Sequence, residues 1–195
     1  WRNQAIARLP QIARHGQFWK RRAETQLARS VSNDANSPDE LQTLARAAAG
    51  FYRSGEFAEA VSAYDRARVA ASTQGQQDQF FDLSLTAAAI EQEQENYAEA
   101  AKRFRELALA MPEHTRAAEA HMTAVYNCAR AARSKRPIVL DEYLAWLEEH
   151  VRTWPQAASA DQARWLLARV YQQQGQSDEA MPELRRISPE SPRFI

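Results

Sequence analysis

A short phrase recurs along this chain at a regular interval, and it limits the folds that the chain can adopt. The phrase is a glycine or a polar turn residue, an aromatic residue two positions later, and an alanine three positions after that. Copies lie at 55–60, 95–100 and 175–180, where Ser177 replaces the aromatic residue, and Gly16 begins a partial copy. The copies are about 40 residues apart, or twice that. This period predicts stacked helical hairpins, because a single hairpin leaves its apolar face exposed to water.

The composition favours helices and excludes several classes of protein. Alanine, glutamine, glutamate and arginine are abundant whereas valine and isoleucine are scarce, which favours helix over strand. The 25 basic and 25 acidic side chains cancel, so no net charge draws the chain to nucleic acid or to an anionic membrane. No apolar run approaches the roughly 20 residues of a membrane helix. We therefore expect no nucleic-acid partner and no membrane-spanning segment in this sequence.

Apolar residues at helical spacing between the turns predict ten helices in five antiparallel pairs. We expect an irregular or degenerate hairpin over 1–36, a repeat array over 37–192 and a short tail over 193–195. Pro10 interrupts the first pair, and Pro182 lies a few residues inside the last helix, where proline removes a backbone hydrogen bond. The hairpins of the array are expected at about 38–75, 78–112, 115–155 and 158–188.

The order of large, small and aromatic residues resembles that of tetratricopeptide repeats. The residues that follow this order are Leu44, Ala48, Phe51, Gly55, Phe57, Ala60, Tyr64 and Ala67, then Ala88, Tyr97, Ala100, Phe104 and Pro112, then Leu167, Ala168, Tyr171, Gly175, Ala180 and Pro192. The resemblance covers about 38–192 and implies an all-α fold, a right-handed α-α superhelix (solenoid) of about five antiparallel helical hairpins. The period is nearer 40 than the family's 34 or so, and the fourth repeat lacks the glycine turn, as in looser bacterial arrays. HEAT-type repeats share the period but lack the Gly-x-aromatic turn and rank second.

The sequence contains no pattern typical of a catalytic or metal centre. Its four histidines do not have the i, i+4 spacing of a helical zinc site, and no glycine-rich phosphate loop is present. Cys128 is the only cysteine and is interpreted as a small packed apolar residue. The carboxylates at 91, 93, 95, 148 and 149 are expected on solvated helix faces. We therefore expect a protein that is not an enzyme and needs no metal or cofactor. The histidines are His15, His114, His121 and His150.

Two short basic clusters, 20–22 and 133–136, stand out from the mixed charge of the chain. The first adjoins Phe18 and Trp19, a combination that can stack on bases or lie at a membrane surface. Because both clusters are short and the overall charge is zero, we interpret them as solubilising surface residues.

The family resemblance implies one functional surface, the concave face formed by the first helix of each hairpin. The family's carboxylate clamp is expected to be absent, because its positions hold Ala45, Ala49 and Thr86. The remaining mixture of small, aromatic and polar residues suits a peptide lying in a groove. The candidate partner-binding residues are Arg46, Ala49, Tyr52, Arg53, Gln92, Tyr126, Asn127, Trp165, Arg169 and Gln172.

We therefore predict a non-catalytic scaffold that binds a protein or peptide segment on its concave face. The alternative is a structural spacer or a self-associating module of a larger multidomain bacterial protein, for example of the envelope. Because the first residue is Trp1 rather than methionine, we expect the sequence to belong to a longer product. The bacterial cytoplasm, periplasm and envelope all stay open as its location.

Overall fold

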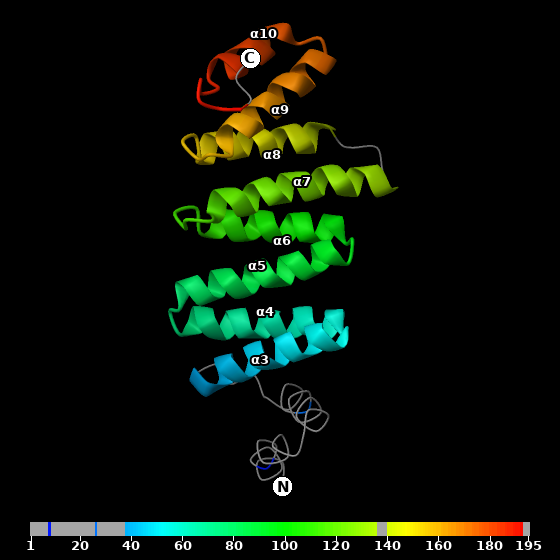
Figure 1. Ribbon diagram of the computed structural model, residues 1–195, viewed down its shortest axis with the longest axis vertical. Coiled ribbons are helices and arrows are strands. Elements are labelled where there is room, and N and C mark those ends of the chain that lie inside the picture. Colours follow the sequence, from blue (N-terminus) through cyan, green and yellow to red (C-terminus); the bar gives the residue numbers. More distant parts are fainter. Residues whose placement is uncertain (1–7, 9–25, 27–37, 136–139, 193–195) are drawn as a thin grey trace. The chain divides into compact units, whose positions relative to one another are not determined.

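The computed structural model describes residues 8, 26, 38–135 and 140–192, and every regular element within them is an α-helix (Figure 1). This confirms the predicted all-α class. The predicted first hairpin and the C-terminal tail lie outside the described residues, apart from two isolated positions. The chain divides into two compact units, 1–94 and 95–195, each of which is considered by itself.

The described part of the first unit, from residue 38 on, contains three helices, of which the middle one packs against both others (Figure 1). They are α3 (Pro38–Ser54), α4 (Phe57–Thr73) and α5 (Gln77–Glu93). One apolar cluster surrounds Phe51, Val61 and Ile90, and a second joins Leu41 and Leu44 to three alanines of α4. Most of the buried residues of α4 are alanines, whose small side chains allow helix axes to approach closely.

Within 95–135 and 140–192, the described residues of the second unit form five helices that contact one another in chain order. They are α6 (Tyr97–Ala110), α7 (Ala117–Lys135), α8 (Leu140–Thr153), α9 (Ala160–Gln173) and α10 (Ser177–Arg185). A shared core joins α7, α8 and α9 through Met122, Val125, Leu147, Ala163 and Leu167. Helix α10 is nine residues long, and it continues for three residues beyond Pro182.

The helix ends explain why the repeated phrase begins with glycine. After α3, the amide of Gly55 donates to the carbonyl of Tyr52 at 3.1 Å, and the next amide donates to the carbonyl of Phe51 at 2.9 Å. This pair of bonds caps a helix end and needs a residue with a left-handed backbone. The φ angles of Gly55, Gly75 and Gly175 are +81°, +69° and +76°, so all three occupy that region.

Glu95 occupies the same place in the turn between α5 and α6, with a φ of +60°. A side chain in this region costs about 1 kcal/mol, which glycine avoids. We expect Glu95→Gly to raise the free energy of unfolding by about 0.5–1 kcal/mol in urea titrations. The reverse change, Gly55→Glu, is the matched control and should lower it by about 1 kcal/mol, since a Cβ there meets no atom within 4 Å and only the backbone is strained. A loss of stability in Glu95→Gly would contradict this explanation.

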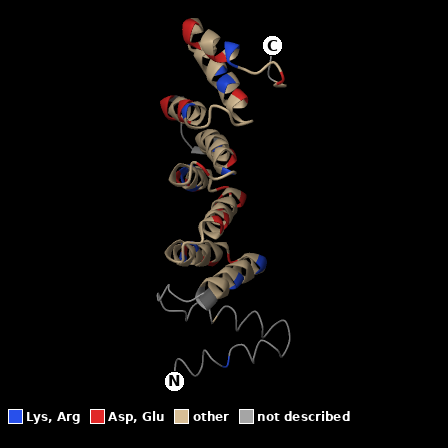
Figure 2. Cartoon of the chain, turned by 90° about the vertical axis from the view of Figure 1, so that its left-hand side faces the viewer, with Lys and Arg blue, Asp and Glu red and all other residues tan. Residues whose placement is uncertain are grey.

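Charged residues of both signs are distributed along the described helices. Figure 2 shows lysine and arginine positions interleaved with aspartate and glutamate positions along them. None of the helices in the described part has both the length and the apolar character needed to cross a bilayer.

Candidate functional site

In the first unit, the structure brings Tyr52 of α3 into contact with Glu93 of α5. The hydroxyl of Tyr52 donates to Oε2 of Glu93 at 2.7 Å, and its ring packs edge-on against Phe57 with centroids 5.7 Å apart. The hydrogen bond to Glu93 raises the pKa of Tyr52. Arg46 and Arg53 are exposed on the same helix. Ala49 and Gln92, the other two predicted residues of this unit, are half-buried.

In the second unit, the predicted residues of α9 form a stacked pair. The guanidinium of Arg169 lies over the ring of Trp165, 4.7 Å from its centroid. Burial raises the pKa of Tyr143 on α8, and the positive charge of Arg169 acts against that rise. Tyr126 and Gln172 are exposed and Trp165 is half-buried.

Asn127, predicted on the binding face, is instead buried. Its Nδ2 donates to the carbonyl of Thr123 at 2.9 Å. The physical reason is helical periodicity, because Asn127 lies one turn after the buried Ala124 and so shares the core-facing side of α7. The adjacent Tyr126 is turned by about 100° and reaches the surface.

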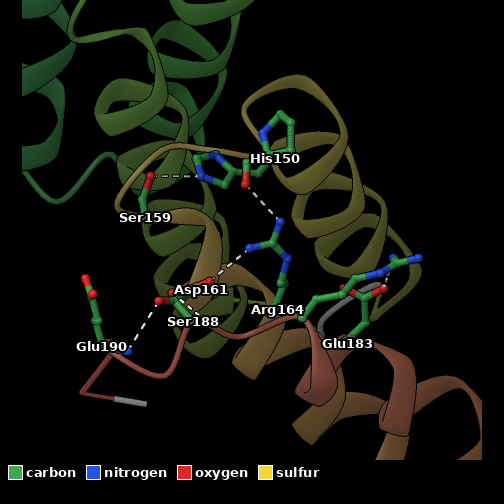
Figure 3. Close-up of polar contacts among 9 residues, drawn as sticks. His150, Ser159, Asp161, Arg164, Glu183, Ser188 and Glu190 are labelled. Carbon is green, nitrogen blue, oxygen red and sulfur yellow. Dashed lines mark hydrogen bonds and ion pairs between the residues drawn. The ribbon is translucent and has the colours of Figure 1, made fainter. Parts of the chain in front are cut away.

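Sequence reasoning missed a buried polar chain through the second unit, here called the histidine relay. His121 of α7 and His150 of α8 are both 0% exposed, and their Nδ1 atoms are 3.3 Å apart. Nε2 of His121 lies 2.9 Å from Oε2 of Glu149, and Nε2 of His150 lies 2.9 Å from Oγ of Ser159, as Figure 3 shows for the latter pair. Arg105 of α6 completes the relay through two hydrogen bonds to Glu149, of 2.6 and 2.9 Å.

The direction of every hydrogen bond in the relay follows from the donors and acceptors available. A carboxylate can only accept, so Nε2 of His121 carries the proton donated to Glu149. A neutral His121 then accepts at Nδ1, and Nδ1 of His150 donates to it. Nε2 of His150 is left to accept from the hydroxyl of Ser159. One arrangement of protons therefore satisfies all five side chains, with both imidazoles neutral.

Burial keeps the histidines in that neutral form. It lowers the pKa of His121 and lowers the pKa of His150 to about 4. Trp154 covers both rings, with centroids 5.0 Å from His121 and 5.5 Å from His150. Burial acts to raise the pKa of Glu149, but hydrogen bonds from Arg105 and His121 outweigh it and hold that pKa below its usual range.

The contact between Ser159 and His150 has the geometry of a nucleophile and its base, but its chemistry is unsuitable near neutral pH. A base whose pKa is about 4 accepts a proton from a hydroxyl poorly at pH 7. Burial also raises the pKa of Cys128 to about 11, so this thiol stays protonated. Among the described residues, no three His, Cys, Asp or Glu side chains are grouped to hold a metal ion. The relay is therefore interpreted as a structural network.

The expectation that Glu149 lies on a solvated helix face is wrong, whereas its neighbour Glu148 is exposed as expected. The Glu149 side chain is only 15% exposed and binds Arg105 and His121. A sequence signal for the relay did exist, because His121 lies one turn after Ala117 and His150 one turn after Leu147, at spacings that continue the core.

Comparisons with known proteins support the fold. No family model matches the sequence, and no curated protein matches it significantly. Among solved structures, the chain resembles a Podosopora anserina protein of nearly identical TPR-like repeats, assigned as a kinesin light chain, with 15% identity, a TM-score of 0.51 and coverage of 95% of this chain and 92% of that one. It also resembles residues 41 to the end of MamA from Desulfovibrio magneticus RS-1, with 14% identity, a TM-score of 0.45 and coverage of 95% and 90%. The first likeness shows the fold alone, and it confirms the predicted tetratricopeptide-like helical repeats.

Proposed function

Because the chain has a tetratricopeptide-like repeat fold, we propose that it is a non-catalytic scaffold that binds a protein or peptide segment. Binding would use the first-helix face, which consists of residues on α3 and α5 in the first unit and of residues on α7 and α9 in the second unit. Its members are Arg46, Ala49, Tyr52, Arg53 and Gln92, and then Tyr126, Trp165, Arg169 and Gln172. A fold of this kind suits an interaction scaffold.

The observation that carries the proposal is the exposure of tyrosine on this face in both units. Four large apolar side chains are exposed among the described residues, and the two aromatic ones, Tyr52 and Tyr126, belong to the first-helix face. Their exposed fractions are 38% and 40%. Tyrosine and arginine are the residue types that most often anchor protein interfaces. The other two, Val69 at 53% and Met181 at 47%, lie on α4 and α10.

The anchors are also held in place before any partner binds. The bond to Glu93 fixes the hydroxyl of Tyr52, and the ring of Trp165 fixes the guanidinium of Arg169. Side chains that are already ordered lose less entropy on binding than free ones. Arginine stacked on an aromatic ring keeps its donors available for a carboxylate or a carbonyl.

The four exposed apolar side chains provide a matched experiment. A random peptide library would be selected against the chain, and the dissociation constants of the selected peptides measured for four single alanine variants. We expect Tyr52→Ala or Tyr126→Ala, or both, to weaken binding by about 10-fold to 30-fold. Val69→Ala and Met181→Ala should change it by no more than about twofold. Circular dichroism would verify that each variant keeps its helices.

Two results would count against the scaffold. Equal losses in all four variants would show that the first-helix face has no special role. A failure to select any peptide, together with light scattering that shows association of the chain with itself, would favour the structural spacer or self-assembly module instead.

A further inference from the structure

A cavity of ≈ 440 Å³ lies in the second unit between α8, α9 and α10. Leu167 and Val151 supply apolar lining. Tyr171 also lines the cavity, and its hydroxyl donates a hydrogen bond to Oε1 of Glu148 at 2.7 Å. The volume falls within the range of small-ligand sites, which combine apolar walls with a few polar groups. None of the residues of the first-helix face lines this cavity.

Arg164 of α9 is the first of two polar groups that make the cavity unusual. It is only 9% exposed, and Figure 3 shows its guanidinium fixed by two hydrogen bonds. Nη1 donates to Oδ1 of Asp161 and Nη2 to the carbonyl of Pro155, both at 2.9 Å. Its Nε is buried and has no acceptor among the described residues. The two bonds hold the planar group in place, so this remaining N–H cannot turn away to find another partner.

Glu183 of α10 is the second such group, and its side chain is 15% exposed. Oε1 accepts from Nη1 of Arg186 at 3.1 Å. Oε2 is buried and has no donor among the described residues. Both Arg164 and Glu183 line the cavity, and each carries one buried polar atom without a partner among the described residues, an N–H donor on Arg164 and a carboxylate oxygen on Glu183. Buried groups of this kind are normally hydrogen-bonded.

The charges around the cavity favour an uncharged ligand. Arg152, Arg164 and Arg186 line it together with Glu148 and Glu183, and Asp161 pairs with Arg164 from just outside the lining. Three positive charges therefore meet three negative ones. Neither an anion nor a cation would gain a net attraction that offsets its loss of hydration.

We propose that this cavity is a second binding site, which takes a main-chain amide of an extended partner peptide. The amide carbonyl accepts from Nε of Arg164, the amide N–H donates to Oε2 of Glu183, and an apolar side chain packs on Val151. A peptide amide has the one acceptor and one donor that these groups lack, and it carries no charge. The site goes beyond the first-helix face and does not depend on it.

The test uses N-acetyl-leucine-N-methylamide, a neutral probe with peptide amides and one apolar side chain. The whole chain would be labelled with 15N at arginine, and the Nε–H signal of Arg164 assigned by its loss in Arg164→Lys. We expect the probe to shift this signal with a dissociation constant of about 1 mM, as suits so small a ligand. Two comparison compounds should bind more weakly than this probe. They are N-acetyl-leucine, which is an anion, and isovaleramide, a primary carboxamide that carries the isobutyl group of leucine but no main-chain amide.

Matched variants on α10 separate this site from general effects. Glu183→Ala should weaken binding of the probe by about tenfold, since it removes a charged acceptor. The exposed Glu179, one turn earlier, is the control, and Glu179→Ala should change the affinity by no more than about twofold. Tyr126→Ala should bind the probe as the wild type does, whether or not the first-helix face binds a partner. The proposal is overturned if the Arg164 signal does not move, if both glutamate variants behave alike, or if either comparison compound binds better.

Discussion

Acidification from pH 7.5 to pH 5 is expected to lower the free energy of unfolding of the second unit by about 2 kcal/mol, through His150 alone. In the folded chain this imidazole is fully buried and its pKa lies at about 4, against about 6.5 in an unfolded chain. Between these values the unfolded chain takes up a proton that the folded chain does not. Stability is therefore complete above pH 6.5 and falls as the pH falls, with a loss of about 3 kcal/mol by pH 4.

The surroundings of His150 explain why it stays neutral. Burial is the largest cause of its lowered pKa, and the charge of Arg164 and a protonated His121 act in the same direction. The pKa of His121 is lowered as well, so its protonation adds to the loss. Glu149, which precedes His150 in the sequence, accepts hydrogen bonds from Arg105 and from His121.

Urea titrations at half-unit steps of pH would measure this effect, with tryptophan fluorescence as a signal because Trp154 lies against both rings. His150→Gln should be less stable at pH 7.5 and should lose most of the pH dependence between 6.5 and 4. His114→Gln removes a histidine outside the relay, whose Nδ1 accepts from the backbone amide of Arg116, and is the comparison variant. A wild-type chain whose stability is flat over this range would show that the buried histidines are not held neutral.

Glu149→Ala is expected to lower the free energy of unfolding by about 3 kcal/mol at neutral pH. The carboxylate accepts from two nitrogens of Arg105 and from Nε2 of His121, and the histidine is fully buried. Removal of the acceptor leaves the guanidinium and the imidazole N–H without their partner inside the unit. Such a loss costs more than the interaction itself contributes, because the fully buried imidazole stays desolvated.

Glu148→Ala is the matched control, because Glu148 is the adjacent residue on α8. Its side chain is exposed and accepts one hydrogen bond, from Tyr171. The expected loss is about 0.5–1 kcal/mol. Urea titration of both variants at pH 7.5 measures the difference. Equal effects would mean that the relay contributes nothing beyond an ordinary surface contact.

The fold could be predicted well from the sequence because the repeat pattern depends on residues that are only a few positions apart. Gly55 and Gly175 are needed for left-handed turns, and the alignment of copies placed Glu95 in the same position, where the structure shows the same backbone. Apolar and small residues at helical spacing then define the buried face of each helix. These signals depend on neighbours a few residues apart, which sequence reasoning sees directly.

The polar network and the cavity depended on contacts between helices, which sequence spacing does not reveal. Glu148 and Glu149 look alike in the sequence, but a rotation of about 100° along α8 exposes one and turns the other toward Arg105. The pair of Arg164 and Glu183 comes from two helices and forms a site only once α9 and α10 pack. Asn127 is a further example. It was predicted to lie on the binding face because it is polar and outside the predicted core, but the structure buries it.

Site-specific photocrosslinking to a selected peptide is the most direct test of the proposed scaffold. Benzoylphenylalanine would replace one exposed apolar residue at a time, Tyr52, Val69, Tyr126 or Met181, and the crosslinked peptide would be identified by mass spectrometry. The scaffold account predicts crosslinks from position 52, position 126 or both, and none from 69 or 181. Crosslinks confined to 69 or 181 would contradict it, because they would place the partner on the second helices of the hairpins.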